Sequence, residues 1–192
     1  MSEPREPLPA KLVCSALSAV LPEVWPRVVA ALESRFGPAE VAFPAQAFSH
    51  TGYYDAELGR PLSRRVLAFA RLVPQGALRE AKLFANALEK ELARDDGRRR
   101  VNLDPGLLTQ ERLVLATGKN FTHRVYLGDG IFADLTLVFQ AGSWQTLPWT
   151  FPDYASPDMQ DILSDIRRRY RRDLREAASP THSRKEPPCP RA

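Results

Sequence analysis

The chain has 192 residues, of which 44% are hydrophobic and 26% are charged, as expected for one globular domain with a substantial core. Its formal net charge is +4, and the segment 179–192 supplies +2 of this, which leaves only +2 for residues 1–178. Such a small excess gives little support to binding of nucleic acid through a strongly basic surface.

Hydropathy and cysteine usage predict a cytoplasmic protein. No window approaches the roughly 18 uninterrupted apolar residues of a membrane span. The start of the sequence has neither the basic residues nor the apolar stretch of a secretory signal. Cys14 and Cys189 are far apart and suggest no disulfide framework, which is typical of a reducing compartment.

The first half of the chain alternates strand-like and helical segments. Proline opens the first helix, because the first helical position gives up only an unpaired N–H. The strand that contains Pro44 is expected at a sheet edge, because proline cannot donate to a ladder. In order, the sequence predicts a flexible leader (1–9), a strand (11–18), a helix from Pro22 or Pro26 to Gly37-Pro38, an edge strand (40–48), a long loop (49–63), a strand (65–73) and a helix (77–92).

The second half adds strands and one helix. The segment 100–103 completes the order β-α-β-β-α-β, which is typical of a ferredoxin-like unit. Asp129-Gly130 between two alternating apolar runs predicts a β-hairpin. The prediction is therefore an α+β fold: a ferredoxin-like unit extended by an antiparallel meander, with a C-terminal helix across it. The further elements are strands over 112–117, 122–127 and 131–139, a helix capped by Ser156-Pro157-Asp158, a single domain over 10–178, and a disordered tail over 179–192.

Several familiar motifs fail on inspection. Gly118-Lys119 is no phosphate-binding loop, because Leu113 and Asn120 stand where that loop needs a glycine and a serine or threonine. The spacing of Gly128, Gly130 and Ala133 matches a dinucleotide fingerprint, but it leads into a strand and not into a helix. No Cys/His cluster suits zinc. The sequence leaves open whether the protein uses a cofactor or a metal.

The predicted hairpin brings a histidine near a carboxylate. A two-residue turn at Asp129-Gly130 makes His123 and Asp134 diagonal neighbours on one sheet face. A turn centred one residue earlier pairs them directly, whereas a three-residue loop pairs Arg124 with Asp134 as a salt bridge. An imidazole oriented by a carboxylate can act as a general base or a metal ligand. His123 and Asp134 are therefore the candidate catalytic residues.

Other polar residues gather at the ends of apolar runs. We expect Asn102, Asp104 and Thr117 to meet His123 and Asp134 in one pocket. Basic side chains suit an anion, because charge-assisted bonds to oxyanions are strong. The remaining candidate ligand-binding residues are Lys119, Arg124, Lys82 and Asn86.

Each candidate also has a structural interpretation. His123 can be a hydrogen-bonded sheet histidine, and 102–106 can be a turn with side-chain-to-backbone bonds. Lys82, Asn86 and Glu89 share one side of the predicted helix and can form a solvated face. The arginines of the last helix can be surface charge.

Spaced motifs from about Pro9 to Leu174 resemble a known family. They include Tyr53-Tyr54-x-x-Glu57-x-Gly59, Val101-Asn-Leu-Asp-Pro-Gly106, Leu113-Val-Leu-Ala-Thr117-x-Lys119, His123-Arg-Val-Tyr-Leu127 and Trp149-Thr-Phe-Pro-Asp-Tyr154. They resemble the bacterial family catalogued as domain of unknown function 4416. Its members commonly have Glu at the position of Asp134. Some are labelled GTP-binding, which the missing phosphate loop does not support. The resemblance implies no particular chemistry.

Two functional hypotheses follow. The favoured one is a polar pocket for a small anionic ligand, phosphate-bearing or a nucleotide, with catalysis left open. The alternative is a non-catalytic module that binds RNA or protein through the sheet face, Tyr53, Tyr54 and the arginine-rich last helix. The absence of aromatic RNA-binding motifs and the small charge of residues 1–178 argue against RNA. The sequence leaves the oligomeric state open.

Overall fold

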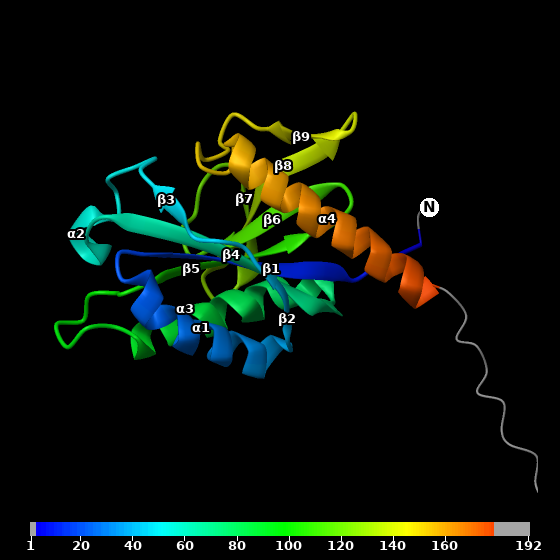
Figure 1. The fold of residues 1–192 in the computed structure, drawn as a ribbon. Helices are drawn as coiled ribbons and strands as arrows, with labels where there is room; N and C mark the ends of the chain where they lie inside the picture. The colour runs from blue at the N-terminus through cyan, green and yellow to red at the C-terminus, as the bar shows by residue number, and fades with distance from the viewer. Residues whose placement is uncertain (1–2, 179–192) are drawn as a thin grey trace, which may run out of the picture.

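The structure, a computed structural model, describes residues 3–178, so the predicted tail and Cys189 lie outside it. Within these residues the chain forms one antiparallel sheet with helices on both faces (Figure 1). The elements are β1 (Ala10–Ser18), α1 (Leu21–Phe36), β2 (Ala39–Ala42), β3 (Gln46–Phe48), α2 (Asp55–Leu58), β4 (Leu62–Val73), η1 (Gln75–Ala77), α3 (Leu78–Glu91), β5 (Asn102–Leu108), β6 (Arg112–Thr117), β7 (Arg124–Gly128), β8 (Ile131–Gln140), β9 (Ser143–Thr146) and α4 (Pro157–Ala178).

The protein has two core layers, one on each face of the sheet, because helices cover both faces. Its strand order is β2-β4-β1-β5-β6-β8-β7, with β3 also paired to β4 and β9 to β8. α1 and α3 lie on one face and α4 crosses the other (Figure 1). Every residue of β1 is buried, since Leu12 and Cys14 pack in the layer of α1 and α3 while Val13 packs under α4. The α+β class predicted from the sequence is confirmed.

Several element boundaries differ from the prediction. The expected strand over 40–48 is two strands, β2 and β3, because the chain breaks around Pro44; both pair with β4. The expected loop over 49–63 contains α2, and β4 already begins at Leu62. β9 was not expected; Trp144 on this strand is buried under α4.

The segment Asp104-Pro105-Gly106 is not a turn but the middle of β5. Leu103 turns its N–H and C=O away from β1, toward side chains of α3. Backbone groups two residues apart on a strand point in the same direction, so those of Pro105 also point away from β1. The N–H that proline lacks therefore removes no hydrogen bond to β1. Gly106 lies so close to β6 that an added Cβ would be 2.7 Å from Leu115 Cδ2 and 3.0 Å from Val114 O. Proline and glycine, which suggested a turn in the sequence, are therefore accommodated within a strand, where Gly106 allows the close approach of β6.

The β7–β8 hairpin combines the two-residue turn of the first predicted register with the Arg124–Asp134 pairing of the third. Asp129-Gly130 forms the turn with φ of 52° and 74°, and Gly128 pairs with Ile131. An irregularity between Tyr126 and Gly128 then shifts the ladder by one residue, so that Arg124 pairs with Asp134. The diagonal pairing of His123 with Asp134 is therefore wrong as a register, although the two side chains still meet.

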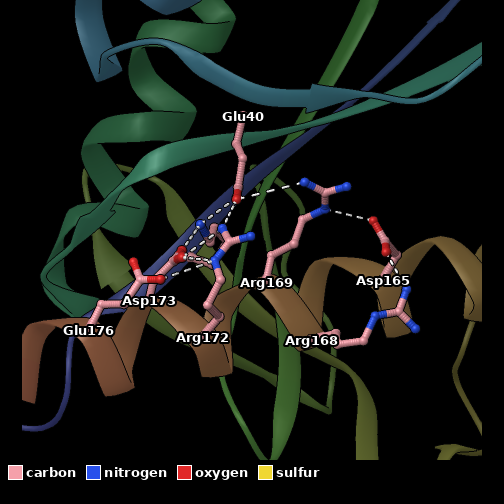
Figure 2. Close-up of polar contacts among 8 residues, drawn as sticks. Glu40, Asp165, Arg168, Arg169, Arg172, Asp173 and Glu176 are labelled. Atoms are coloured by element: carbon pink, nitrogen blue, oxygen red, sulfur yellow. Dashed lines mark hydrogen bonds and ion pairs between the residues drawn. The ribbon is translucent and has the colours of Figure 1, made fainter.

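α4 is anchored by a buried lysine. Lys11 on β1 is fully buried, with its Nζ 2.8 Å from Glu40 Oε2 on β2 and in an ion pair with Asp173 of α4. Glu40 also faces Arg169 and Arg172, as Figure 2 shows. The arginines of α4 shown there are thus paired with acids, whereas the sequence suggested plain surface charge.

Candidate functional site

The outer edge of β5 is completed by α3 and not by a strand. β6 pairs with β5 only over Gly106–Leu108, so Leu103, which pairs with Ala16 of β1 on one side, has no strand on its other side. Glu89 Oε1 accepts the Leu103 N–H at 2.6 Å, and Lys82 Nζ donates to Leu103 O at 2.7 Å. Both side chains are buried, because the helix faces an edge where backbone groups need partners. The predicted solvated face is wrong for Lys82 and Glu89; Asn86 between them is half-buried.

A chain of polar contacts extends from this edge. Asn102 Nδ2 donates to Asp104 Oδ2 at 2.7 Å, and Arg99 Nη1 donates to Asn102 Oδ1 at 2.8 Å. Arg99 also holds Glu57 of α2 with two bonds of 2.6 and 2.7 Å. We call this group the edge cluster: Glu57, Lys82, Glu89, Arg99, Asn102 and Asp104.

The edge cluster perturbs the pKa values of its acids in opposite directions. The Arg99 hydrogen bonds hold the pKa of Glu57 below its usual range. Burial raises the pKa of Glu89, although Lys82 and Arg99 oppose this. Directly before α2, burial raises the pKa of Tyr54 to about 12.

A buried arginine lies beside this cluster on the α4 side of the sheet. Arg64 of β4 forms an ion pair with Asp153, and both side chains are almost fully buried. Its guanidinium carbon is 4.7 Å from the Phe48 ring centre and 5.2 Å from that of Tyr154. Arg64 Nε has no hydrogen-bond partner among the described residues.

A second group, the hairpin cluster, forms around Asp134. Its Oδ2 accepts from Arg124 Nε at 2.8 Å and lies 3.3 Å from His123 Nε2. The His123 ring stacks on Trp149, with centres 4.8 Å apart and planes 9° apart. Trp149 is itself fixed by donation from Nε1 to Leu135 O at 2.8 Å. The imidazole is thus held in one orientation by a carboxylate and an aromatic plane.

Two distant loops meet beside these clusters at Lys119 and Tyr53. Lys119 Nζ donates to Tyr53 Oη at 2.7 Å and lies 4.2 Å from the centre of its ring. This hydrogen bond lowers the pKa of Tyr53. Two hydrogen bonds hold the loop of Lys119. The backbone N–H of Lys119 donates to Thr117 Oγ1, and Arg124 Nη1 donates to the backbone carbonyl of Lys119.

The contacts among the predicted site residues form two groups. Asn102 and Asp104 meet in the edge cluster with Lys82, whereas His123 and Asp134 meet in the hairpin cluster. Thr117 and Lys119 join the second group through Arg124. Arg99 and Trp149 are partners that the sequence analysis did not select. The charged triplet 98–100 and the aromatic run 149–154 were visible, but neither pattern indicates its partner.

The described residues contain no group of three or more His, Cys, Asp or Glu side chains arranged to hold a metal ion. Within residues 3–178 no helix has the length and apolar character needed to cross a membrane.

Fold and clusters together define an α+β protein with charged and polar side chains, several of them buried, concentrated along one antiparallel sheet. The chain belongs to the family described as domain of unknown function (DUF4416), whose sequence model matches residues 8–170. A search of the curated proteins gave no significant match, and neither did a search of the solved structures.

Proposed function

We propose that the protein binds a small anionic ligand, phosphate-bearing or a nucleotide, through Lys119 and Tyr53. The observation that carries this proposal is the exposed Lys119 ammonium, which bonds a tyrosine hydroxyl. Within residues 3–178 it forms no ion pair with a carboxylate, unlike Arg99 and Arg124. An ammonium and a phenolic O–H side by side offer two donors to one oxyanion.

The surrounding residues fit supporting roles. Arg124 and Thr117 position the Lys119 loop through the backbone bonds described above. Glu57 and Arg99 adjoin Tyr53, since both influence its pKa. In this proposal Asn102, Asp104, Lys82 and Asn86 shape the edge against which the ligand is oriented.

His123 is the candidate for proton transfer if the ligand is a substrate. Asp134 and Trp149 fix its ring. Loss of ligand response in His123→Ala, with a nearly unchanged melting temperature, supports this role. A drop in stability with an unchanged ligand response overturns it, because a structural histidine behaves in that way.

The test is a thermal-shift screen with inorganic phosphate, sugar phosphates and nucleotides, since a ligand of the native state raises apparent stability. We expect Lys119→Met and Tyr53→Phe each to weaken the response to a stabilising compound by about tenfold, because each loses a bond to a charged group. Lys90→Met, at an exposed lysine of α3, is the matched control. Equal responses in wild type and Lys119→Met overturn the proposal.

RNA binding is the alternative, and the charge arrangement favours it less. Arg168, Arg169 and Arg172 of α4 are all paired with acids. RNA affinity falls steeply as salt rises, whereas a single small anion responds much less. A steep salt dependence of binding to a single-stranded RNA would support the alternative.

We further propose that β1-α1-β2-β4-α3-β5 is a ferredoxin-like unit and that the protein is cytoplasmic. The order β2-β4-β1-β5, antiparallel throughout and covered by α1 and α3 on one face, supports the first. The buried free thiol of Cys14 supports the second.

A further inference from the structure

A cavity of about 390 Å³ lies beside the start of α3, away from the edge and hairpin clusters. Its floor is apolar and comes from three strands: Leu107 of β5, Val114 of β6 and Ala133 of β8. These residues face the layer of α1 and α3. No residue of either cluster lines it, nor does Lys119 or Tyr53.

Two arginines stand at the rim of this cavity. Arg112 of β6 is exposed and has no ion pair with any carboxylate among the described residues. Arg79 of α3 is 3.3 Å from Asp129, but both side chains are about half exposed, and such pairs bind weakly. The first turn of α3 has no side-chain cap. Positive charge therefore lies above an apolar floor, and the carboxylate paired with it among residues 3–178 is the half-exposed Asp129.

Arg79 lies against the hairpin turn between β7 and β8. A Cβ added at Gly128 would be 2.9 Å from Arg79 Nη1 and 3.4 Å from its Cδ. Gly128 also has φ of +112°, a conformation that other residues rarely adopt. The guanidinium thus lies against the backbone of Gly128 and lines the cavity.

We propose that this cavity binds an anion with a short apolar body, a medium-chain carboxylate or an alkyl phosphate. The apolar body lies on Leu107, Val114 and Ala133, and the anionic head lies between Arg79 and Arg112. The volume holds about 13 non-hydrogen atoms at roughly 30 Å³ each, and it is in the usual range for ligand sites. This site is separate from Lys119 and goes beyond the function proposed above.

Calorimetric titration of the full-length protein tests the proposal with four compounds. Octanoate and octyl phosphate carry both parts and distinguish the two kinds of head. Octanamide lacks the charge, and inorganic phosphate lacks the apolar body. We expect one or both anionic amphiphiles to bind at least about tenfold more tightly than octanamide and phosphate, because each of these loses one set of contacts. If octanamide binds as tightly as the anionic amphiphiles, the proposed role of the anionic head is wrong. If phosphate binds as tightly, the proposed role of the apolar body is wrong.

Variants locate the site. Arg112→Met and Arg79→Met should each weaken binding by about tenfold. Gly76→Leu should block the cavity without disturbing the fold, since a Cβ there meets no atom within 4 Å. Lys90→Met on the same helix and Lys119→Met in the other site should bind as the wild type does. If the Arg112, Arg79 and Gly76 variants all bind like wild type, the cavity is not the site.

Discussion

Lys82 and Glu89 are buried charged side chains, and both form hydrogen bonds with the backbone of the same residue, Leu103. Lys82→Met should lower the free energy of unfolding by about 3 kcal/mol, because it leaves Leu103 O without its donor and the carboxylate of Asp104 without the buried cation. Urea denaturation measures this loss. Lys90→Met, an exposed lysine on the same helix, should change it by less than about 0.5 kcal/mol. A similar small effect at Lys82 would show that water replaces the ammonium.

Glu89 should make stability depend on pH. Its folded-state pKa is raised above the usual value of 4.5 by burial, so the folded protein holds this proton more tightly than the unfolded chain. Stability from this group is therefore full below pH 4.5 and is lost as pH rises through the raised pKa. Glu89→Gln keeps an acceptor for the Leu103 N–H and should remove this decline. Parallel pH profiles of the two proteins, measured by urea denaturation, would contradict the prediction.

Among the elements, β5 depends on a glycine that the sequence made look like part of a turn. Gly106→Ala should cost about 1–3 kcal/mol, because the new Cβ meets the backbone oxygen Val114 O at 3.0 Å. Gly76→Ala is the control, since its Cβ meets nothing within 4 Å. Thermal and urea unfolding of both variants compare the two positions. Equal stabilities would mean that β6 moves away at little cost.

The same strand shows where sequence reasoning stops. Apolar spacing located α1, α3 and α4, because a helix buries one stripe whatever its partner is. Local turn signals failed at Pro105-Gly106, since they do not reveal that this segment pairs with β1 on one side and, from Gly106, lies close to β6 on the other. The hairpin turn itself was predicted, but not the shifted ladder beyond Tyr126.

The candidate site was predictable only in pairs close in sequence. His123 and Asp134 are joined by one hairpin, and Asn102 and Asp104 by one strand, so each pair could be expected to meet. Lys82 was expected in solvent, because helical periodicity does not show that the facing sheet lacks a strand. Tyr53 and Lys119 come from loops 66 residues apart, a contact that no local pattern predicts.

The docking of α4 on the sheet should depend on the buried Lys11, as the docking of α3 depends on the buried Lys82. Lys11→Met removes the buried cation between Glu40 and Asp173, leaves the half-exposed Arg172 as the cation that both acids share, and should lower the free energy of unfolding by about 3 kcal/mol in urea denaturation. Adding Glu40→Gln and Asp173→Asn should recover part of this loss, because the repulsion is then removed. Arg27→Met, in an exposed pair with Glu91, should cost less than about 1 kcal/mol. No recovery in the triple variant would point to lost packing instead of lost charge.

At the scale of the whole molecule, the two core layers should unfold together. They share β1, whose buried residues alternate between the two layers. Trp25 packs in the layer of α1 and α3, whereas Trp144 packs under α4. Single-tryptophan variants that keep one or the other should therefore show the same urea midpoint by fluorescence. An earlier transition at Trp144 would mean that α4 and its layer open separately.

Lys82 and Glu89 together take the place of a neighbouring strand along β5, with one donor and one acceptor for Leu103. This arrangement links two positions on a helix to the extent of the pairing between β5 and β6, which stops at Gly106 although β6 runs on to Thr117. In a relative whose β6 stayed paired with β5 as far as Leu103, the strand backbone would serve Leu103, and both buried charges would lose this role. Substitution at the two positions should therefore be correlated across the family: the lysine and the glutamate kept together, or both replaced by apolar residues where the pairing continues.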